Sequence, residues 1–112
     1  MTPDDRIRLT HMVEALESAI SFTQGHEPED LQTDPMLRFA LLHAIQIAGE
    51  AALKIDSGIR AAHPDVPWAA IIGMRHRLVH AYADIDHAIL WTTATEAVPK
   101  LLAQIQVILA TG

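Results

Sequence analysis

The sequence predicts an all-α fold, an antiparallel bundle of four to five helices formed by a single domain that spans residues 1–112. Apolar residues recur at three- and four-residue steps along several segments, which is the period of an amphipathic helix. No segment alternates apolar and polar residues as a half-buried strand would, and polar stretches containing proline separate the periodic segments. With 112 residues, half of them apolar, the chain has the length of one domain with one core.

The first predicted helix begins at Pro3 and ends near Gly25. Thr2 is suited to be its N-cap, Pro3 fits the first turn, and the acidic residues that follow are favoured by the helix dipole. The face turned to the core should carry Leu9, Met12, Val13, Leu16 and Ile20. Residues 26–33 are polar and include a proline, so we expect them to connect this helix to the next one.

The second predicted helix covers residues 35–56 and is the candidate for the centre of the bundle. Asp34 is its expected N-cap, and apolar side chains occupy most of its circumference. Its polar exceptions, His43, Gln46 and Glu50, fall on one stripe. That stripe is interpreted either as a seam facing solvent or as a surface facing a site or a second subunit.

Two further helices complete the bundle. Residues 63–67, His-Pro-Asp-Val-Pro, break the chain because a residue before proline is disfavoured in helical conformation. A third helix is predicted over 68–79, and a last helix follows Asp86, its expected N-cap, and continues through Leu109. Pro99 should kink or split this last helix.

Composition excludes several classes of function. The chain has no cysteine, which rules out a disulfide scaffold, thiolate chemistry and metal sites built on sulfur, and makes the cytoplasm the expected location. No membrane span is expected, because His43, Gln46 and Glu50 interrupt the most apolar stretch. The N-terminus is acidic where a signal peptide would be basic, so none is expected.

Charge is distributed unevenly along the chain. Residues 1–34 hold eight acidic residues against two arginines and thus carry the whole formal net charge of −6. This excess argues against indiscriminate binding of nucleic acid, which needs clustered cations. In the balanced remainder, Arg75, His76, Arg77 and His80 lie within six residues that include no acid. We expect an anionic ligand to bind there.

Residues 74–82 allow three interpretations. His76 and His80 have the i, i+4 spacing of a helical metal site, but Arg77 stands where a zinc peptidase has its glutamate base, so no metal is expected. A purely structural role makes the arginines solvated charges and His80 a satisfied histidine. The third interpretation is cleavage of RNA without a metal or other cofactor, in which a histidine moves protons and an arginine stabilises the charge on phosphorus.

Helical geometry complicates the third interpretation. Arg75 and His80 lie about 140° apart on a regular helix, so one helix cannot easily aim both at the same phosphate unless it unwinds before His80 or Arg75 reaches around it. A two-fold dimer that sets two such helices side by side would pool both copies of each residue. A homodimer is therefore predicted.

At this point the chain resembles a known family, the HepT-like toxins of the HEPN superfamily. The similarity includes Gly49-Glu50-Ala51-Ala52, Pro67-Trp68, Gly73-Met74-Arg75 and a final helix with Trp91 and Pro99. Arg75, His80 and Tyr82 match the family's R-x4-H-x-Y signature. The position after the arginine is often asparagine in the family and is His76 here.

The resemblance implies a homodimeric, metal-independent endoribonuclease toxin of a type VII toxin-antitoxin system. Arg75 and His80 would be catalytic, with His76 and Arg77 in support. An MntA-like nucleotidyltransferase antitoxin would neutralise the toxin by transferring AMP to Tyr82. That anionic group would compete with RNA for the same cations. The alternative is a non-catalytic HEPN module that only binds a nucleotidyltransferase or a nucleotide, and a purely structural helical protein comes third.

Overall fold

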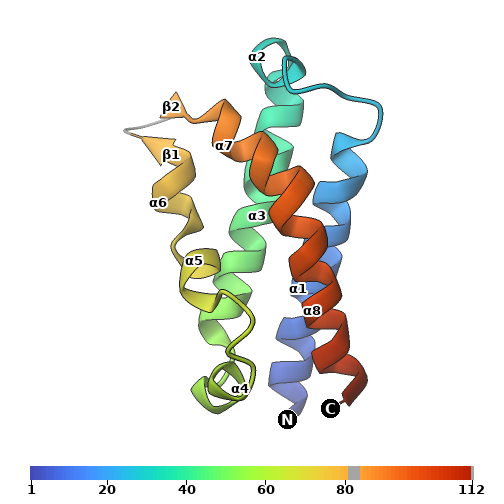
Figure 1. Cartoon of the computed structure of the whole chain (residues 1–112), viewed down its shortest axis with the longest axis vertical. Helices are drawn as coiled ribbons and strands as arrows, with labels where there is room; N and C mark the ends of the chain where they lie inside the picture. Colours follow the sequence, from blue (N-terminus) through green and yellow to red (C-terminus); the bar gives the residue numbers. More distant parts are fainter. Residues whose placement is uncertain (81–83, 112) are drawn as a thin grey trace.

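A computed structural model describes residues 1–80 and 84–111, leaving the side chains of Arg75, Val79 and His80 aside. Four columns of helix run up, down, up and down, with both termini at the same end (Figure 1). The first two columns are α1 (Pro3–Thr23) and α3 (Pro35–Lys54), the third contains α5 (Trp68–Ile72) and α6 (Met74–Leu78), and the fourth joins α7 (His87–Thr92), η1 (Thr93–Ala97) and α8 (Val98–Thr111). The predicted all-α antiparallel bundle is confirmed.

Helix α1 begins as the sequence predicts. The Thr2 hydroxyl oxygen accepts a hydrogen bond from the Asp5 amide at 3.1 Å and donates one to the Asp5 carboxylate at 2.8 Å. That carboxylate is 4% exposed and also accepts from the Asp56 amide, at 3.1 Å, just beyond the end of α3. The Thr2 hydroxyl, and then the Asp56 amide, lower the pKa of Asp5. Asp5 thus joins the start of the first column to the end of the second.

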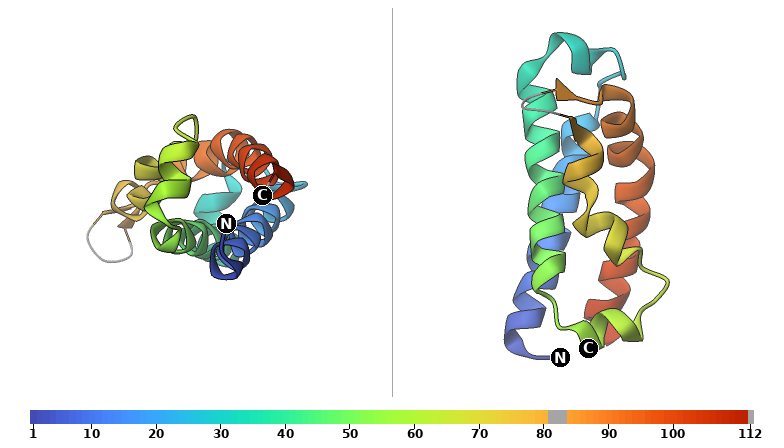
Figure 2. Two further views of the ribbon diagram at one scale, coloured as in Figure 1. Left: turned by 90° about the horizontal axis from the view of Figure 1, so that it is seen from below. Right: turned by 90° about the vertical axis from the view of Figure 1, so that its left-hand side faces the viewer.

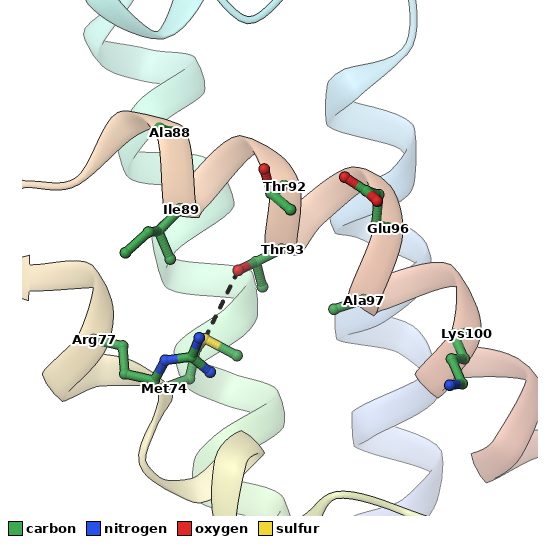
Figure 3. A pocket seen from close by; sticks show the side chains of 9 residues that line it. All are labelled: Met74, Arg77, Ala88, Ile89, Thr92, Thr93, Glu96, Ala97 and Lys100. Carbon is green, nitrogen blue, oxygen red and sulfur yellow. Dashed lines mark hydrogen bonds between the residues drawn. The ribbon is translucent and has the colours of Figure 1, made fainter.

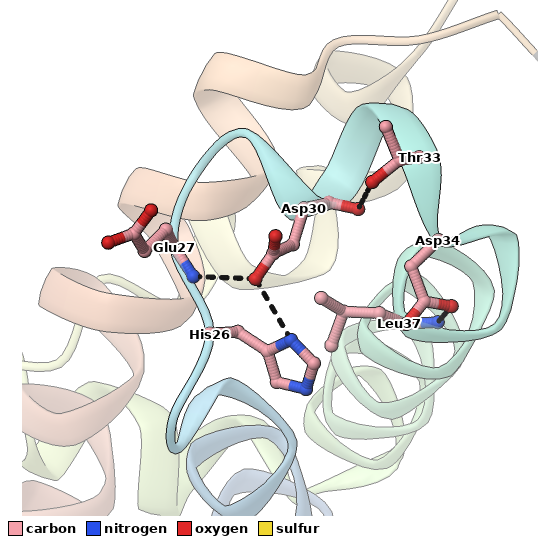
Figure 4. Close-up of polar contacts among 6 residues, drawn as sticks. All are labelled: His26, Glu27, Asp30, Thr33, Asp34 and Leu37. Carbon is pink, nitrogen blue, oxygen red and sulfur yellow. Dashed lines mark hydrogen bonds and ion pairs between the residues drawn. The ribbon is translucent and has the colours of Figure 1, made fainter.

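The connection between α1 and α3 contains a short helix, α2 (Asp30–Thr33), which the sequence analysis did not predict. Gly25, at φ +77°, lets the chain turn after α1. The Asp30 carboxylate then accepts from the Glu27 amide at 2.9 Å and lies 3.1 Å from Nδ1 of His26 (Figure 4). These two contacts, the Glu27 amide first, lower the pKa of Asp30. A helical turn forms here because it carries Leu31 into the core, where it is fully buried.

Helix α3 is the central helix, as predicted, and contacts α1, α2, α5, α6 and α7. The Asp34 side chain caps it by accepting from the Leu37 amide at 3.1 Å (Figure 4). Among the described helices it has the length and mean hydropathy, 1.3, of a membrane span, but half of that stretch is buried by the rest of the bundle. Of its polar stripe, His43 and Glu50 are exposed. In the single chain, the stripe of polar residues on α3 therefore faces solvent.

The third column is more broken than predicted. A helix α4 (Ser57–Ala62), absent from the sequence analysis, follows α3 and is capped by the Asp56 carboxylate on the Gly58 amide at 3.0 Å. The helix predicted over 68–79 divides at Gly73 into α5 and α6 and ends at Leu78. Seen from the side in Figure 2, this column crosses the face of the bundle obliquely.

A small antiparallel pair of strands follows α6, whereas the sequence predicted no strand. Strand β1 (Val79–His80) pairs with β2 (Asp84–Ile85), with Val79 opposite Ile85 and His80 opposite Asp84. The Leu78 carbonyl accepts from the Asp86 amide at 2.9 Å, so the backbone leaves the helix at Leu78 and pairs with residues 84–86. Two-residue strands are too short to carry an alternating pattern, which is why the sequence gives no sign of them.

The fourth column confirms both features predicted for it. The Asp86 carboxylate caps α7 by accepting from the Ile89 amide at 3.0 Å. The π-helical segment η1 separates α7 from α8, in which Pro99 is the second residue. A proline has no amide hydrogen and its ring clashes with the carbonyl four residues earlier, here that of Thr95 within η1. The wider π-helical turn accommodates that clash.

Candidate nuclease site

The structure places the cationic motif at the end of the third column. Arg75, His76 and Arg77 belong to α6, while His80 belongs to β1, opposite Asp84. The side chains of His76 and Arg77 are exposed. Tyr82, the predicted site of modification, lies outside the described residues.

The end of α6 at Leu78 changes the geometry on which two of the sequence interpretations depend. His80 is two residues beyond the helix, so the angle of about 140° from Arg75, which holds for a regular helix, does not apply to it. The unwinding that the nuclease interpretation requires is present. For the same reason His76 and His80 do not share a helical face, which removes the premise of the helical metal site. No cluster of three or more His, Asp or Glu that could hold a metal occurs in residues 1–80 and 84–111.

Buried contacts on both sides fix the position of α6. Leu78 is fully buried and Met74 is 9% exposed, so this short helix is anchored at both ends. Before it, Trp68 donates from Nε1 to the His63 carbonyl at 3.0 Å, which ties the start of α5 to the preceding loop. A Cβ built on Gly49 of α3 would lie 2.9 Å from the Ile71 carbonyl oxygen. Only glycine permits the two helices to approach this closely.

A groove of about 540 Å³ lies between α6 and the fourth column (Figure 3). Met74 and Arg77 line it from α6, and Ile89, Thr93 and Ala97 face them from the other wall. Its rim includes Thr92, Glu96 and Lys100.

Arg77 is predicted as a site residue from the sequence, whereas the residues of the opposite wall are not. A signal was available: Thr92, Glu96 and Lys100 recur every four residues on a helix that is otherwise largely apolar, which marks one polar stripe. That stripe resembles an ordinary solvated face until the fold sets it across from Arg77.

A bundle that carries an arginine and a histidine where an inner helix breaks into a hairpin has the groups needed for metal-independent cleavage of a phosphodiester. A family model described as "Ribonuclease HepT-like" matches residues 12–108. The chain belongs to this family of HepT-like ribonucleases, as the resemblance predicted, and is a ribonuclease.

Relatives named as ribonucleases match most of the chain. "Probable ribonuclease HepT" of Thermococcus cleftensis is 37% identical over 93 residues, which cover 83% of this chain and 84% of the relative. "Putative RNase MJ1380" of Methanocaldococcus jannaschii is 31% identical over 105 residues, covering 94% and 96%. "Putative RNase TTE0752" of Caldanaerobacter subterraneus is 35% identical over 101 residues, covering 90% of each chain. No solved structure gives a significant match.

Proposed function

We propose that this ribonuclease is a metal-independent endoribonuclease and the toxin of a type VII toxin-antitoxin system. His80 acts as general acid or base and Arg75 stabilises the charge on phosphorus, with His76 and Arg77 adding positive potential beside them. The observation that carries this proposal is the end of α6 at Leu78. It frees His80 from the helical geometry that would direct it away from Arg75.

The proposed active form is a homodimer in which two copies of the motif share one cleft. Support comes from the outer face of α3, where Met36, Phe39 and Leu53 are 83%, 50% and 58% exposed. These residues lie on the same face as His43 and Glu50, and α3 packs directly against α5 and α6. Large exposed apolar side chains on one helix face, next to the motif, are typical of a surface that a second subunit covers.

Control of the toxin is proposed to act through Tyr82. An MntA-like nucleotidyltransferase antitoxin would transfer AMP to its hydroxyl, and the added phosphate would occupy the cationic motif in place of RNA. Residues 75–80 include two arginines and two histidines and no acid, so they suit such a competitor. The proposed location is the cytoplasm, where RNA is available to the toxin.

The nuclease proposal is tested by incubating the purified protein with total RNA in the presence of a chelator. The wild-type chain should produce fragments, and His80→Ala should slow their formation by about 10²- to 10⁴-fold, as expected for loss of a general acid or base. His11→Ala, which removes an exposed histidine from α1, is the matched control. Equal cleavage by His80→Ala and wild type would assign the activity to a contaminant.

Modification is tested by co-expression with an MntA-like nucleotidyltransferase. The intact mass should rise by one or more AMP units, and Tyr82→Phe should abolish the rise. An unchanged mass with an active transferase would contradict the proposed control. If the protein binds that transferase but the wild-type chain cuts no RNA, the alternative of a non-catalytic binding module holds instead.

A further inference from the structure

The groove between α6 and the fourth column is lined by three charged side chains. Within residues 1–80 and 84–111, Arg77, Glu96 and Lys100 form no ion pair or side-chain hydrogen bond. Arg77 projects into the groove from α6, while Glu96 and Lys100 lie on the opposite wall (Figure 3). A volume of about 540 Å³ is in the range of small-molecule sites, roughly 300–1,000 Å³. The groove thus has the size and the free polar groups of a binding site.

Its floor is apolar. Met74, Ile89 and Ala97 line it, and the Thr93 hydroxyl makes a weak contact of 3.9 Å with the Met74 sulfur across it. A mostly apolar cavity of about 130 Å³ adjoins the groove and shares Met74, Arg77, Thr93 and Ala97 with it. A floor of thioether and aliphatic groups suits the face of a planar ring better than it suits a bare ion.

The wall that carries Thr93, Glu96 and Ala97 is the π-helical segment η1. A π-helical turn inside an α-helix is rare and occurs frequently at functional sites. Pro99 explains why the helix widens here, and three residues of the widened segment line the groove. The geometry of the backbone therefore singles out the same region as the unpaired charges.

The groove lies next to the proposed catalytic residues. Arg77 follows Arg75 by two residues on the five-residue helix α6, so the two positions are about 3 Å apart along the axis and about 160° apart around it. An RNA strand that contacts both passes around this short helix. On the opposite wall, Ala88 and Ile89 belong to the first turn of α7, directly after the hairpin that contains His80. A strand of RNA with its scissile phosphate at the motif can therefore extend into the groove by its neighbouring nucleotide.

We propose that this groove binds the nucleotide adjacent to the scissile phosphate, and that it selects guanine there. The inference rests on the proposed nuclease function. The base stacks on the floor, Arg77 and Lys100 contact the flanking phosphates, and the Glu96 carboxylate accepts hydrogen bonds from the guanine N1–H and N2–H groups. Guanine is favoured because its edge presents two adjacent donors to a carboxylate, whereas the other bases place an acceptor beside their donor.

The test uses a fluorescent RNA oligonucleotide with 2′-O-methyl groups throughout, which removes the nucleophile and prevents cleavage. One version contains guanine at a single position and the other adenine. The wild-type chain should bind the guanine version about tenfold more tightly, and Glu96→Gln should lose most of that preference, as expected for a two-bond contact to a base. Glu14→Gln, on the exposed surface of α1, is the matched control.

A second pair of variants tests occupancy of the groove. Ala97→Trp fills it and should weaken binding of the guanine oligonucleotide by at least about tenfold, the effect of losing roughly 1.4 kcal/mol. Ala103→Trp adds the same side chain at an exposed position of α8 outside the groove and should leave affinity unchanged. Equal affinities for these two variants would overturn the proposal.

The remaining outcomes separate the two proposals. If guanosine monophosphate displaces the oligonucleotide when the two are present at equal concentrations, the groove is a site for free nucleotide and the assignment to RNA substrate is wrong. Because the probe cannot be cut, binding is measured whether or not the protein cleaves RNA. Groove-dependent binding without cleavage counts against the nuclease alone, and cleavage without groove-dependent binding counts against the groove alone.

Discussion

Replacing Gly49 by alanine should displace the motif and lower the stability of the fold together. The added Cβ would lie 2.9 Å from the Ile71 carbonyl oxygen, about 0.5 Å closer than an ordinary contact of 3.4 Å. The neighbouring atom is backbone, so it cannot rotate aside, and α5 must move away from α3. Because α5 leads through Gly73 directly into α6, the displacement reaches Arg75 and Arg77.

Two opposing effects determine how much Gly49→Ala lowers the free energy of unfolding. Overpacking costs about 1–3 kcal/mol, and alanine recovers about 0.5–1 kcal/mol relative to glycine within a helix. The net loss of about 1 kcal/mol corresponds to a fall in Tm of about 4–8 °C for a domain of this size. Misplacing reacting groups by about 1 Å can slow catalysis about 100-fold, so a shift of half that distance should slow RNA cleavage by about tenfold.

Thermal melting followed by circular dichroism measures the first quantity, and the initial rate of RNA cleavage at saturating substrate measures the second. Gly58→Ala is the matched control, since its Cβ would meet only the movable carboxylate of Asp56, with Oδ2 at 2.8 Å. It should leave cleavage unchanged. If Gly49→Ala melts at or above the wild-type temperature and cleaves RNA at the wild-type rate, the close approach does not position the motif and the reasoning is refuted.

Three further predictions concern contacts that hold the bundle and the hairpin. Leu78→Ala removes a fully buried side chain and should lower the free energy of unfolding in urea by about 2–5 kcal/mol, against less than about 1.5 kcal/mol for Leu78→Met; equal effects would show that packing is not the cause. Asp86→Ala removes the cap of α7 and should destabilise the protein by about 1 kcal/mol, and an unchanged unfolding midpoint would contradict this. The pKa of Asp5 is lowered in the folded chain. Its contribution to the free energy of unfolding is therefore present above the unfolded pKa, near 3.9, and is lost as the pH falls through the lower folded value. Asp5→Asn should lose less stability than the wild type below about pH 4, and an equally steep loss of stability in the two proteins would disprove the assignment.

Local signals in the sequence predict the regular part of the fold. The caps at Thr2, Asp34 and Asp86 and the apolar periodicity of the long segments predict where α1, α3 and α7 begin, because an N-cap needs only its own side chain and an amide two or three residues later. The short helices α2 and α4 escape prediction, since each is defined by a contact or a turn rather than by a period. Leu31, for example, makes α2 helical by reaching a core that only the tertiary fold creates.

The candidate site, too, is predicted where its residues are neighbours in the sequence and escapes prediction where it depends on tertiary contacts. The cationic cluster can be found in the sequence because Arg75, His76, Arg77 and His80 are neighbours in the chain. The end of the helix at Leu78 cannot be predicted from the sequence, because it depends on a backbone hydrogen bond between the Leu78 carbonyl and the Asp86 amide, eight residues away. The opposite wall of the groove cannot be predicted either, because Glu96 and Lys100 lie across from Arg77 only when the fourth column packs beside α6.

Within residues 1–80 and 84–111, two irregular backbone segments lie on the groove or directly after a residue that lines it. One is the break from α6 into β1, and the other is the π-helical segment η1. Each gives up regular α-helical hydrogen bonding, so neither is what the stability of a bundle alone would favour. Departures from local rules in a folded chain are expected where function requires them. Their convergence beside Arg75, Arg77 and His80, while α1 and α3 stay regular on the other side, argues that this end of the bundle is shaped for a ligand rather than for packing.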